Sequence, residues 1–171
     1  KSIFLLNAVN PIDENLKKYL ILGETQEIDK KYLTANRNPW YSIENRPPSP
    51  IWVSVFNRNG LRFIRNEACI SNLTTFHCIY PSKTNLFDNI NIDLLFAYLL
   101  TNVAKQIFED NSREYGNGLQ KFEPNDINKA QMLDLKLLDF KTENTILDLY
   151  HLYRKSVIEN NPDESFINKI N

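Results

Sequence analysis

Arginine is the residue type whose placement in this sequence suggests chemistry. Five of the seven arginines lie within residues 36–66, a window that contains one acid, Glu44, and no lysine. This window therefore has a local charge of +4, although the whole chain has a net charge of −1. A guanidinium group presents a planar fork that grips a phosphate or a guanine edge through two hydrogen bonds. The five residues are Arg37, Arg46, Arg58, Arg62 and Arg65.

Aromatic residues accompany these arginines. Both tryptophans, Trp40 and Trp52, fall in the same window, and Tyr41 follows Trp40. Aromatic rings offer stacking faces to cations and nucleobases, but large aromatics more often anchor a core, which is the role we favour for Trp40 and Tyr41. The sequence leaves open whether the arginines bind a polyanion or only keep a hairpin solvated.

Polar side chains follow the arginine-rich window and can extend such a site. Asn66 ends a predicted strand, while Asn72, Thr74 and Thr75 precede the next one. Asparagine pairs with adenine through two hydrogen bonds, and threonine contacts a phosphate or a thymine methyl group. An ordinary polar turn explains these last three residues equally well. His77 either donates to DNA or is a partly buried histidine that is satisfied by the backbone.

A glycine-containing segment adds two more cations. Arg113 and Lys121 flank Gly116 and Gly118, and glycine lets backbone N–H groups approach a phosphate closely. The alternative is a plain turn that joins two helices. The two glycines lack a third partner and follow no predicted strand, so they do not form a nucleotide-binding turn.

The remaining reactive side chains indicate neither a metal site nor a nucleophile. Cys69 and Cys78, with His77 and His151, lack the spacing of a zinc site. Adjacent strand residues face opposite sides, so His77 is poorly placed to activate Cys78. No stretch approaches the roughly 20 apolar residues that span a bilayer, and we identify no signal peptide. We therefore expect a cytoplasmic protein with reduced thiols and no membrane partner.

Strands are predicted first among the elements that position these residues. Residues 51–56 and 61–65 are β-branched and aromatic runs, and Asn59-Gly60 between them is a strong hairpin signal. A third strand is predicted over residues 74–80. Together they predict an α+β fold, in which a strand-rich N-terminal half with an antiparallel hairpin and further strands packs on C-terminal helices.

Helical periodicity dominates the second half. Apolar residues at helical spacing predict one helix over residues 91–109, capped by Asn89 or Asn91, and a final helix over residues 141–160. Residues 113–123 are predicted to form a loop.

The N-terminal part gives weaker signals. Asp13 is predicted to cap a helix that Gly23 ends, and residues 24–50 are predicted to be an irregular, extended arm. The apolar run 3–6 suits an edge strand or the tail of a preceding element.

Four strings in this order and spacing resemble a known family. They are Tyr32–Tyr41 with Arg46–Ile51, then Arg58–Ala68, Ser71–Pro81 and Tyr115–Pro124. Together they resemble the C-terminal target-recognition, or specificity, domain of TaqI-like N6-adenine DNA methyltransferases and type II (IIG) restriction-modification enzymes. The resemblance covers roughly residues 20–135.

The resemblance implies sequence-specific recognition of double-stranded DNA beside a methyltransferase catalytic domain of the same polypeptide. That domain uses S-adenosylmethionine and acts on an adenine flipped out of the duplex. This sequence has no Asn/Asp-Pro-Pro-Tyr/Phe motif to hold the adenine. We therefore expect a non-catalytic fragment without its own cofactor, from a site-specific adenine methyltransferase that either does or does not carry a fused endonuclease.

The predicted organisation is a DNA target-recognition domain over residues 1–135 and a helical extension over residues 136–171 that packs on it. The alternative is an interaction module that docks onto a catalytic or specificity subunit, with the arginines facing acidic protein. A stand-alone enzyme is the remotest alternative. The predicted DNA-binding residues are Arg37, Arg46, Arg58, Arg62, Arg65, Asn66, Asn72, Thr74, Thr75, His77, Arg113 and Lys121.

Overall fold

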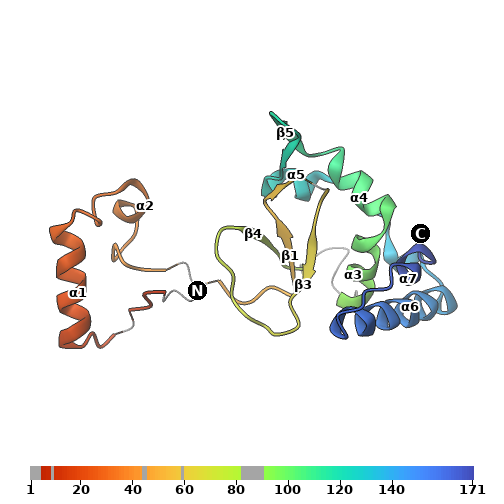
Figure 1. The fold of residues 1–171 in the computed structure, drawn as a ribbon, viewed down its shortest axis with the longest axis horizontal. Coiled ribbons are helices and arrows are strands. Elements are labelled where there is room, and N and C mark those ends of the chain that lie inside the picture. Colours follow the sequence, from red (N-terminus) through yellow and green to blue (C-terminus); the bar gives the residue numbers. More distant parts are fainter. Residues whose placement is uncertain (1–4, 9, 44–45, 59, 82–90) are drawn as a thin grey trace. The chain divides into compact units, whose positions relative to one another are not determined.

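Two compact units, residues 1–46 and residues 47–171, make up the chain (Figure 1). Helices and two small antiparallel sheets form them, so the fold class is α+β, as predicted. None of the described helices is long and apolar enough to cross a membrane, and no cluster of His, Cys, Asp or Glu among the described residues could hold a metal ion. The computed structural model describes residues 5–8, 10–43, 46–58, 60–81 and 91–171.

Helix α1 (Glu14–Thr25) dominates the first unit. Asp13 caps it as predicted, because its carboxylate accepts two backbone N–H groups at 2.8 Å. The predicted end at Gly23 is wrong, since this glycine lies inside the helix, where a Cβ would stand 2.6 Å from the ring of Trp40. Gly23 therefore permits the close packing of Trp40, whose indole also donates to Glu24 at 3.2 Å.

A second, one-turn helix lies in the segment predicted to be irregular. Helix α2 (Tyr32–Ala35) interrupts residues 24–50. The Thr34 hydroxyl donates to the Lys31 carbonyl at 3.1 Å. Four residues are too few to show a helical period, so the sequence carried no signal for this turn.

The first sheet of the second unit has the strand order β3-β1-β4, with β1 (Ile51–Ser54) in the centre. Strand β3 (Phe63–Arg65) pairs with it antiparallel, with Val53 opposite Phe63. Strand β4 (Phe76–Ile79) pairs antiparallel along the other edge. These pairings confirm the predicted hairpin and the predicted third strand.

The second sheet has the order β2-β6-β5 and was not predicted. Strand β2 (Phe56–Asn57) pairs with β6 (Leu119–Lys121), which pairs with β5 (Arg113–Tyr115). The predicted loop over residues 113–123 is therefore wrong. Asn117 and Gly118 have φ angles of 66° and 69°, and this left-handed turn closes a hairpin between two strands that are too short to show a period of two.

The predicted helix over residues 91–109 consists of two helices. Helix α3 (Ile92–Leu100) ends and α4 (Asn102–Glu109) begins at Thr101, whose backbone is extended. The Thr101 hydroxyl donates to the Tyr98 carbonyl at 2.6 Å and accepts the Ala104 N–H at 3.2 Å. A threonine that caps a helix in this way redirects the chain, although the apolar spacing continues past it.

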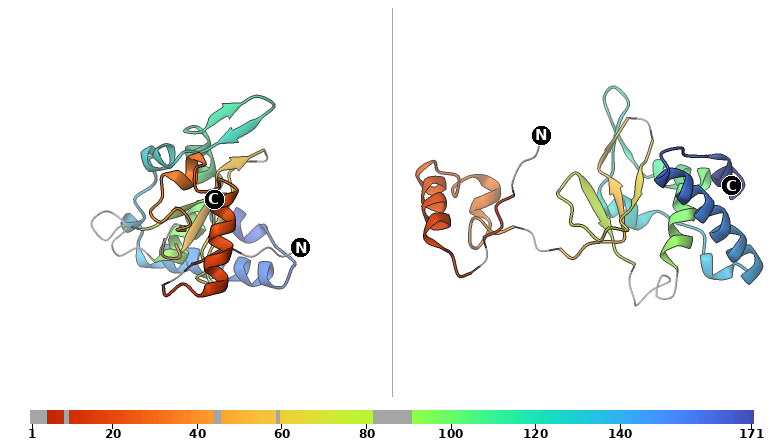
Figure 2. Two further views of the ribbon diagram at one scale, coloured as in Figure 1. Left: turned by 90° about the vertical axis from the view of Figure 1, so that its left-hand side faces the viewer. Right: turned by 60° about the horizontal axis from the view of Figure 1, so that its bottom comes forward.

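One of the C-terminal helices packs against α3. Helix α5 (Pro124–Lys129) and a 3-10 turn (Leu135–Leu137) lead to α6 (Phe140–Ile158), which packs against α3 (Figure 2). The predicted final helix over residues 141–160 matches α6 closely, but a further helix, α7 (Ser165–Asn168), follows it.

One hydrophobic core joins the first sheet to these helices. Ile51 and Val53 of β1 are fully buried, and Phe63 meets Phe108 of α4 edge to face at 5.4 Å. Helix α3 is buried on nearly all sides. The predicted domain boundary after residue 135 stays a prediction.

Several predicted features lie wholly or partly outside the described residues. They are the apolar run 3–6, the acid Glu44, the turn residue Asn59 and the cap Asn89.

Candidate nucleic-acid interface

The arginine-rich window is divided between the two units. Arg37 and Arg46 are exposed residues of the first unit, and Arg37 donates to the Ser42 carbonyl at 3.1 Å. The other three arginines of the window belong to the second unit. These three are Arg58, Arg62 and Arg65.

The three arginines of the second unit have different surroundings. Arg58 and Arg62 are exposed, and neither forms an ion pair with an acid that the structure describes. Arg65 donates to the Asp93 carboxylate and to the Pro50 carbonyl, each at 3.0 Å. Arg65 therefore fastens β3 to the start of α3, and two cations of this set remain open to a ligand.

Asn66 and His77, both predicted to bind DNA, are bonded internally. Asn66 is 5% exposed, and its amide donates to the carbonyls of Ser49 and Ile70 at 2.8 and 2.9 Å and accepts the Ile70 N–H. The ring Nε2 of His77 lies 2.9 Å from the Phe122 carbonyl. Both side chains hold the scaffold together, and His77 has the backbone partner that the sequence left open.

The polar residues before β4 include one that is bonded internally and two that are exposed. Asn72 donates to the Phe76 carbonyl at 2.9 Å, and its side-chain oxygen accepts from the Cys78 thiol at 2.9 Å. Thr74 and Thr75 are exposed. Of these three residues, the two threonines present their side chains to solvent and therefore to a ligand.

The second sheet places two cations beside an aromatic residue that lies far away in the sequence. Lys121 lies opposite Phe56 on one side and opposite Arg113 on the other. These paired residues point to one side of the sheet, and Tyr115 follows Arg113 on the same side by the alternation along a strand. We call this surface the exposed sheet face. Its members are Phe56, Arg113, Tyr115 and Lys121. The exposed Arg58 follows β2 in a bend.

Two acids hold the paired cations of this face. Arg113 and Lys121 would repel each other across the strands, but Arg113 donates to Asp126 at 3.1 Å and the Lys121 ammonium lies 2.5 Å from Glu123. The hydrogen bond from Lys121 lowers the pKa of Glu123, and the same bond raises the pKa of Lys121. Burial raises the pKa of Asp126, but the bonds from Arg113 and the Glu123 N–H outweigh it, so the pKa is lowered.

Aromatic rings accompany the cations on the exposed sheet face. Phe56 is 57% exposed and Tyr115 is 46% exposed. The Lys121 ammonium lies 5.6 Å from the centre of the Phe56 ring and 5.9 Å from that of Tyr115, within cation–π range. Neither ring is among the predicted DNA-binding residues. An Asn117-Gly118 turn with Tyr115 and Leu119 beside it was the available signal.

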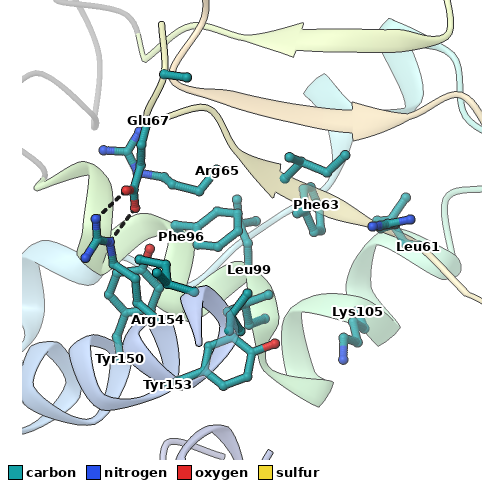
Figure 3. Close-up of a pocket in the computed structure, with 16 residues that line it drawn as sticks. Leu61, Phe63, Arg65, Glu67, Phe96, Leu99, Lys105, Tyr150, Tyr153 and Arg154 are labelled. Atoms are coloured by element: carbon teal, nitrogen blue, oxygen red, sulfur yellow. Dashed lines mark hydrogen bonds and ion pairs between the residues drawn. The ribbon is translucent and has the colours of Figure 1, made fainter. Parts of the chain in front are cut away.

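A separate groove of about 540 Å³ lies between β3 and helices α3, α4 and α6 (Figure 3). Its lining includes the cations Arg62, Arg65, Lys105 and Arg154. Arg154 donates to Glu67 at 2.6 Å across 87 residues of sequence, and this bond lowers the pKa of Glu67. The apolar lining includes Leu61, Phe63, Phe96, Leu99, Leu100, Tyr150, Tyr153, Val157 and Ile158.

Sequence comparison provides the family. The profile described as "Type II methyltransferase M.Eco57I, C-terminal domain" matches residues 1–163. The chain belongs to this family. M.AccI, a type II methyltransferase of Acinetobacter calcoaceticus, is 63% identical over 170 residues, which cover 99% of this chain and 31% of M.AccI. M.XamI, a type II methyltransferase of Xanthomonas campestris pv. amaranthicola, is 25% identical over 123 residues, which cover 72% of this chain and 22% of M.XamI.

The match to the M.Eco57I C-terminal domain family covers the first unit, the second unit as far as residue 163, and the whole exposed sheet face. The chain spans less than a third of the length of these curated relatives. No solved structure matches the chain. Family membership confirms the resemblance carried by the four sequence strings, which all fall within residues 1–163.

Proposed function

We propose that this chain is the DNA target-recognition domain of an adenine-specific DNA methyltransferase of a restriction-modification system. It recognises a site in double-stranded DNA, while a catalytic domain of the same polypeptide binds S-adenosylmethionine and transfers the methyl group in the cytoplasm. Membership of the M.Eco57I C-terminal domain family supports this proposal, as does the small share of each relative that the chain covers.

The observation that carries the proposal is the exposed sheet face. Strand pairing brings Phe56 to the same side of one sheet as Arg113 and Lys121, although more than 50 residues of sequence separate Phe56 from Arg113. The exposed Arg58 follows β2 directly. Cations on a rigid sheet can contact successive phosphates and fix the register of a protein on a duplex. Arg62, Thr74 and Thr75 add exposed groups elsewhere in the same unit, and Arg37 and Arg46 add two in the other.

Four of the predicted DNA-binding residues stabilise the fold of the second unit. Arg65, Asn66, Asn72 and His77 are bonded to protein groups, so a contact with DNA would first have to break those bonds. We therefore assign these four residues a supporting role in the proposed interface.

Salt-dependent binding to a fluorescent duplex of about 30 base pairs tests the proposal on the full-length protein. Each phosphate contact contributes about 0.9 to the slope of log affinity against log salt concentration. Changing Arg58 and Arg62 together to alanine should lower the slope by roughly 2 and weaken binding at least tenfold at low salt. Fluorescence anisotropy over a salt series measures both quantities.

Lys155→Ala is the matched control, because Lys155 is an exposed cation of α6. It should leave both the slope and the affinity unchanged. An unchanged slope in the Arg58→Ala, Arg62→Ala double variant would contradict the proposal.

The groove favours a second function, an interaction module for a catalytic or specificity subunit. Its apolar floor and its cations Arg62 and Lys105 suit a protein segment that carries acidic residues. A wild-type protein that binds no duplex at low salt, but whose association with a purified partner subunit weakens after Leu100→Asp, would support this function over DNA recognition.

A further inference from the structure

Phe56 and Tyr115 are large rings that strands hold in contact with solvent. Their exposed fractions are 57% and 46%. By contrast, Val55, which directly precedes β2, and Phe122, which directly follows β6, are buried. The Phe122 N–H donates to the Val55 carbonyl at 3.0 Å, and β5 pairs with β6. Both rings therefore belong to hydrogen-bonded strands.

The burial of Asn57 explains why Phe56 points outward. The Asn57 amide donates to the Ser54 carbonyl at 3.1 Å, and its side-chain oxygen accepts from the Ser54 hydroxyl. With Asn57 fixed inward, alternation along β2 turns Phe56 outward. The neighbouring β5–β6 hairpin turns Tyr115 to the side that carries Lys121.

The chemistry around the rings selects their partner. The Lys121 ammonium lies within cation–π range of both rings, and Arg113 shares their face. The exposed Arg58 follows β2 directly. An apolar protein surface would leave Arg58, which forms no ion pair with an acid that the structure describes, without a partner, whereas a nucleic acid offers a phosphate for Arg58 and flat bases for the rings. Glu123 and Asp126 neutralise two of the three cations, so ring stacking must supply a substantial share of the affinity.

We propose that Phe56 and Tyr115 stack on nucleobases that have left the duplex stack, while Arg58 contacts a neighbouring phosphate. This inference rests on the proposed DNA-recognition function. Enzymes that modify a base inside a duplex extract it from the stack and leave base faces uncovered. Aromatic rings on a rigid sheet can cover such faces and stabilise the opened duplex.

The test measures the affinity of the full-length protein for two fluorescent duplexes. In one duplex a 2-aminopurine is unpaired, and in the other every base is paired. Wild type should bind the duplex with the unpaired base about tenfold more tightly than the fully paired one. The reason is that stacking one base on an aromatic ring contributes roughly the binding free energy that corresponds to a tenfold change in affinity. Phe56→Ala and Tyr115→Ala should remove most of this preference. Stacking should also quench the 2-aminopurine fluorescence in wild type, and these variants should restore it.

Three controls separate the outcomes. Tyr115→Phe keeps the ring and should keep the preference. Arg58→Ala should weaken binding to both duplexes equally, and Phe140→Ala, at an exposed ring of α6, should change neither. Aromatic variants that retain the preference and the quenching would overturn the stacking inference alone. A wild-type protein that binds neither duplex would overturn the DNA-recognition function itself.

Discussion

The two sheets of the second unit share one run of chain but differ in what their side chains do. In the first sheet, all four residues of β1 (Ile51–Ser54) are buried. Two residues later, β2 (Phe56–Asn57) exposes one side chain and buries the next, and β5 (Arg113–Tyr115) is exposed throughout. Helix α3 covers the first sheet, whereas one side of the second sheet faces solvent. The first sheet therefore contributes its side chains to the core, and the second presents exposed groups, to which we assign the proposed binding role.

The largest expected effect contrasts one phenylalanine from each sheet. Phe63→Ala removes a buried ring that packs on Phe108 and should lower the free energy of unfolding by about 3–5 kcal/mol. Phe56→Ala removes an exposed ring and should change it by less than about 0.5 kcal/mol. Urea unfolding followed by circular dichroism measures both. Similar losses for the two variants would break the distinction between the sheets.

A smaller loss is expected where the first sheet meets the loop after β3. Asn66→Ala would leave the carbonyls of Ser49 and Ile70 and the Ile70 N–H without their amide partner. A buried polar group without a partner costs about 1–3 kcal/mol, so the unfolding free energy should fall by about 2 kcal/mol. Thr74→Ala, at an exposed position nearby in sequence, serves as the control and should have little effect. A stable Asn66→Ala variant with weakened DNA binding would move Asn66 into the interface.

The smallest expected effect concerns pH at the Arg154–Glu67 pair. The hydrogen bond from Arg154 lowers the pKa of Glu67 from its usual 4.5 in the folded protein. The ionised pair therefore stabilises the fold above that value, and this stabilisation is lost as the pH falls through the folded pKa. Because both side chains are partly exposed, its size is roughly 0.5 kcal/mol. Glu67→Gln should unfold more easily than wild type at pH 7, and the difference should shrink as the pH falls through the folded pKa of Glu67.

Urea unfolding of both proteins across this pH range checks the prediction. A constant difference from pH 7 to pH 3 would show that Glu67 acts through packing and not through its charge.

The sequence predicted the parts of the fold that repeat a pattern over enough residues. The β1–β3 hairpin has two apolar runs, and the Asp13 cap precedes a full-length helix, so both were found. Helix α2 and strands β5 and β6 have three or four residues each, which is too short for a period to emerge. The break at Thr101 depends on a local hydroxyl bond that leaves the apolar spacing unchanged.

Some of the predicted site residues are exposed and others are bonded internally, and the sequence could not distinguish the two groups. Residue type indicated which side chains can contact DNA, but exposure depends on pairings between distant segments. Asn66 and Arg65 have the right chemistry and are held by Ser49 and Asp93. Phenylalanine is usually a core residue, but Phe56 is exposed, because pairing with a strand more than 60 residues away in the sequence fixes its register.

The continuous run from Ile51 to Asn57 separates the positions that fold the protein from those that face outward. Substitutions at Phe56 or Arg58 leave the interior packing of β1 untouched, so new side chains can be tried there at little cost to folding. A lineage of such proteins could therefore acquire new preferences for its ligand by changing a few outward positions, while the inherited framework stays the same.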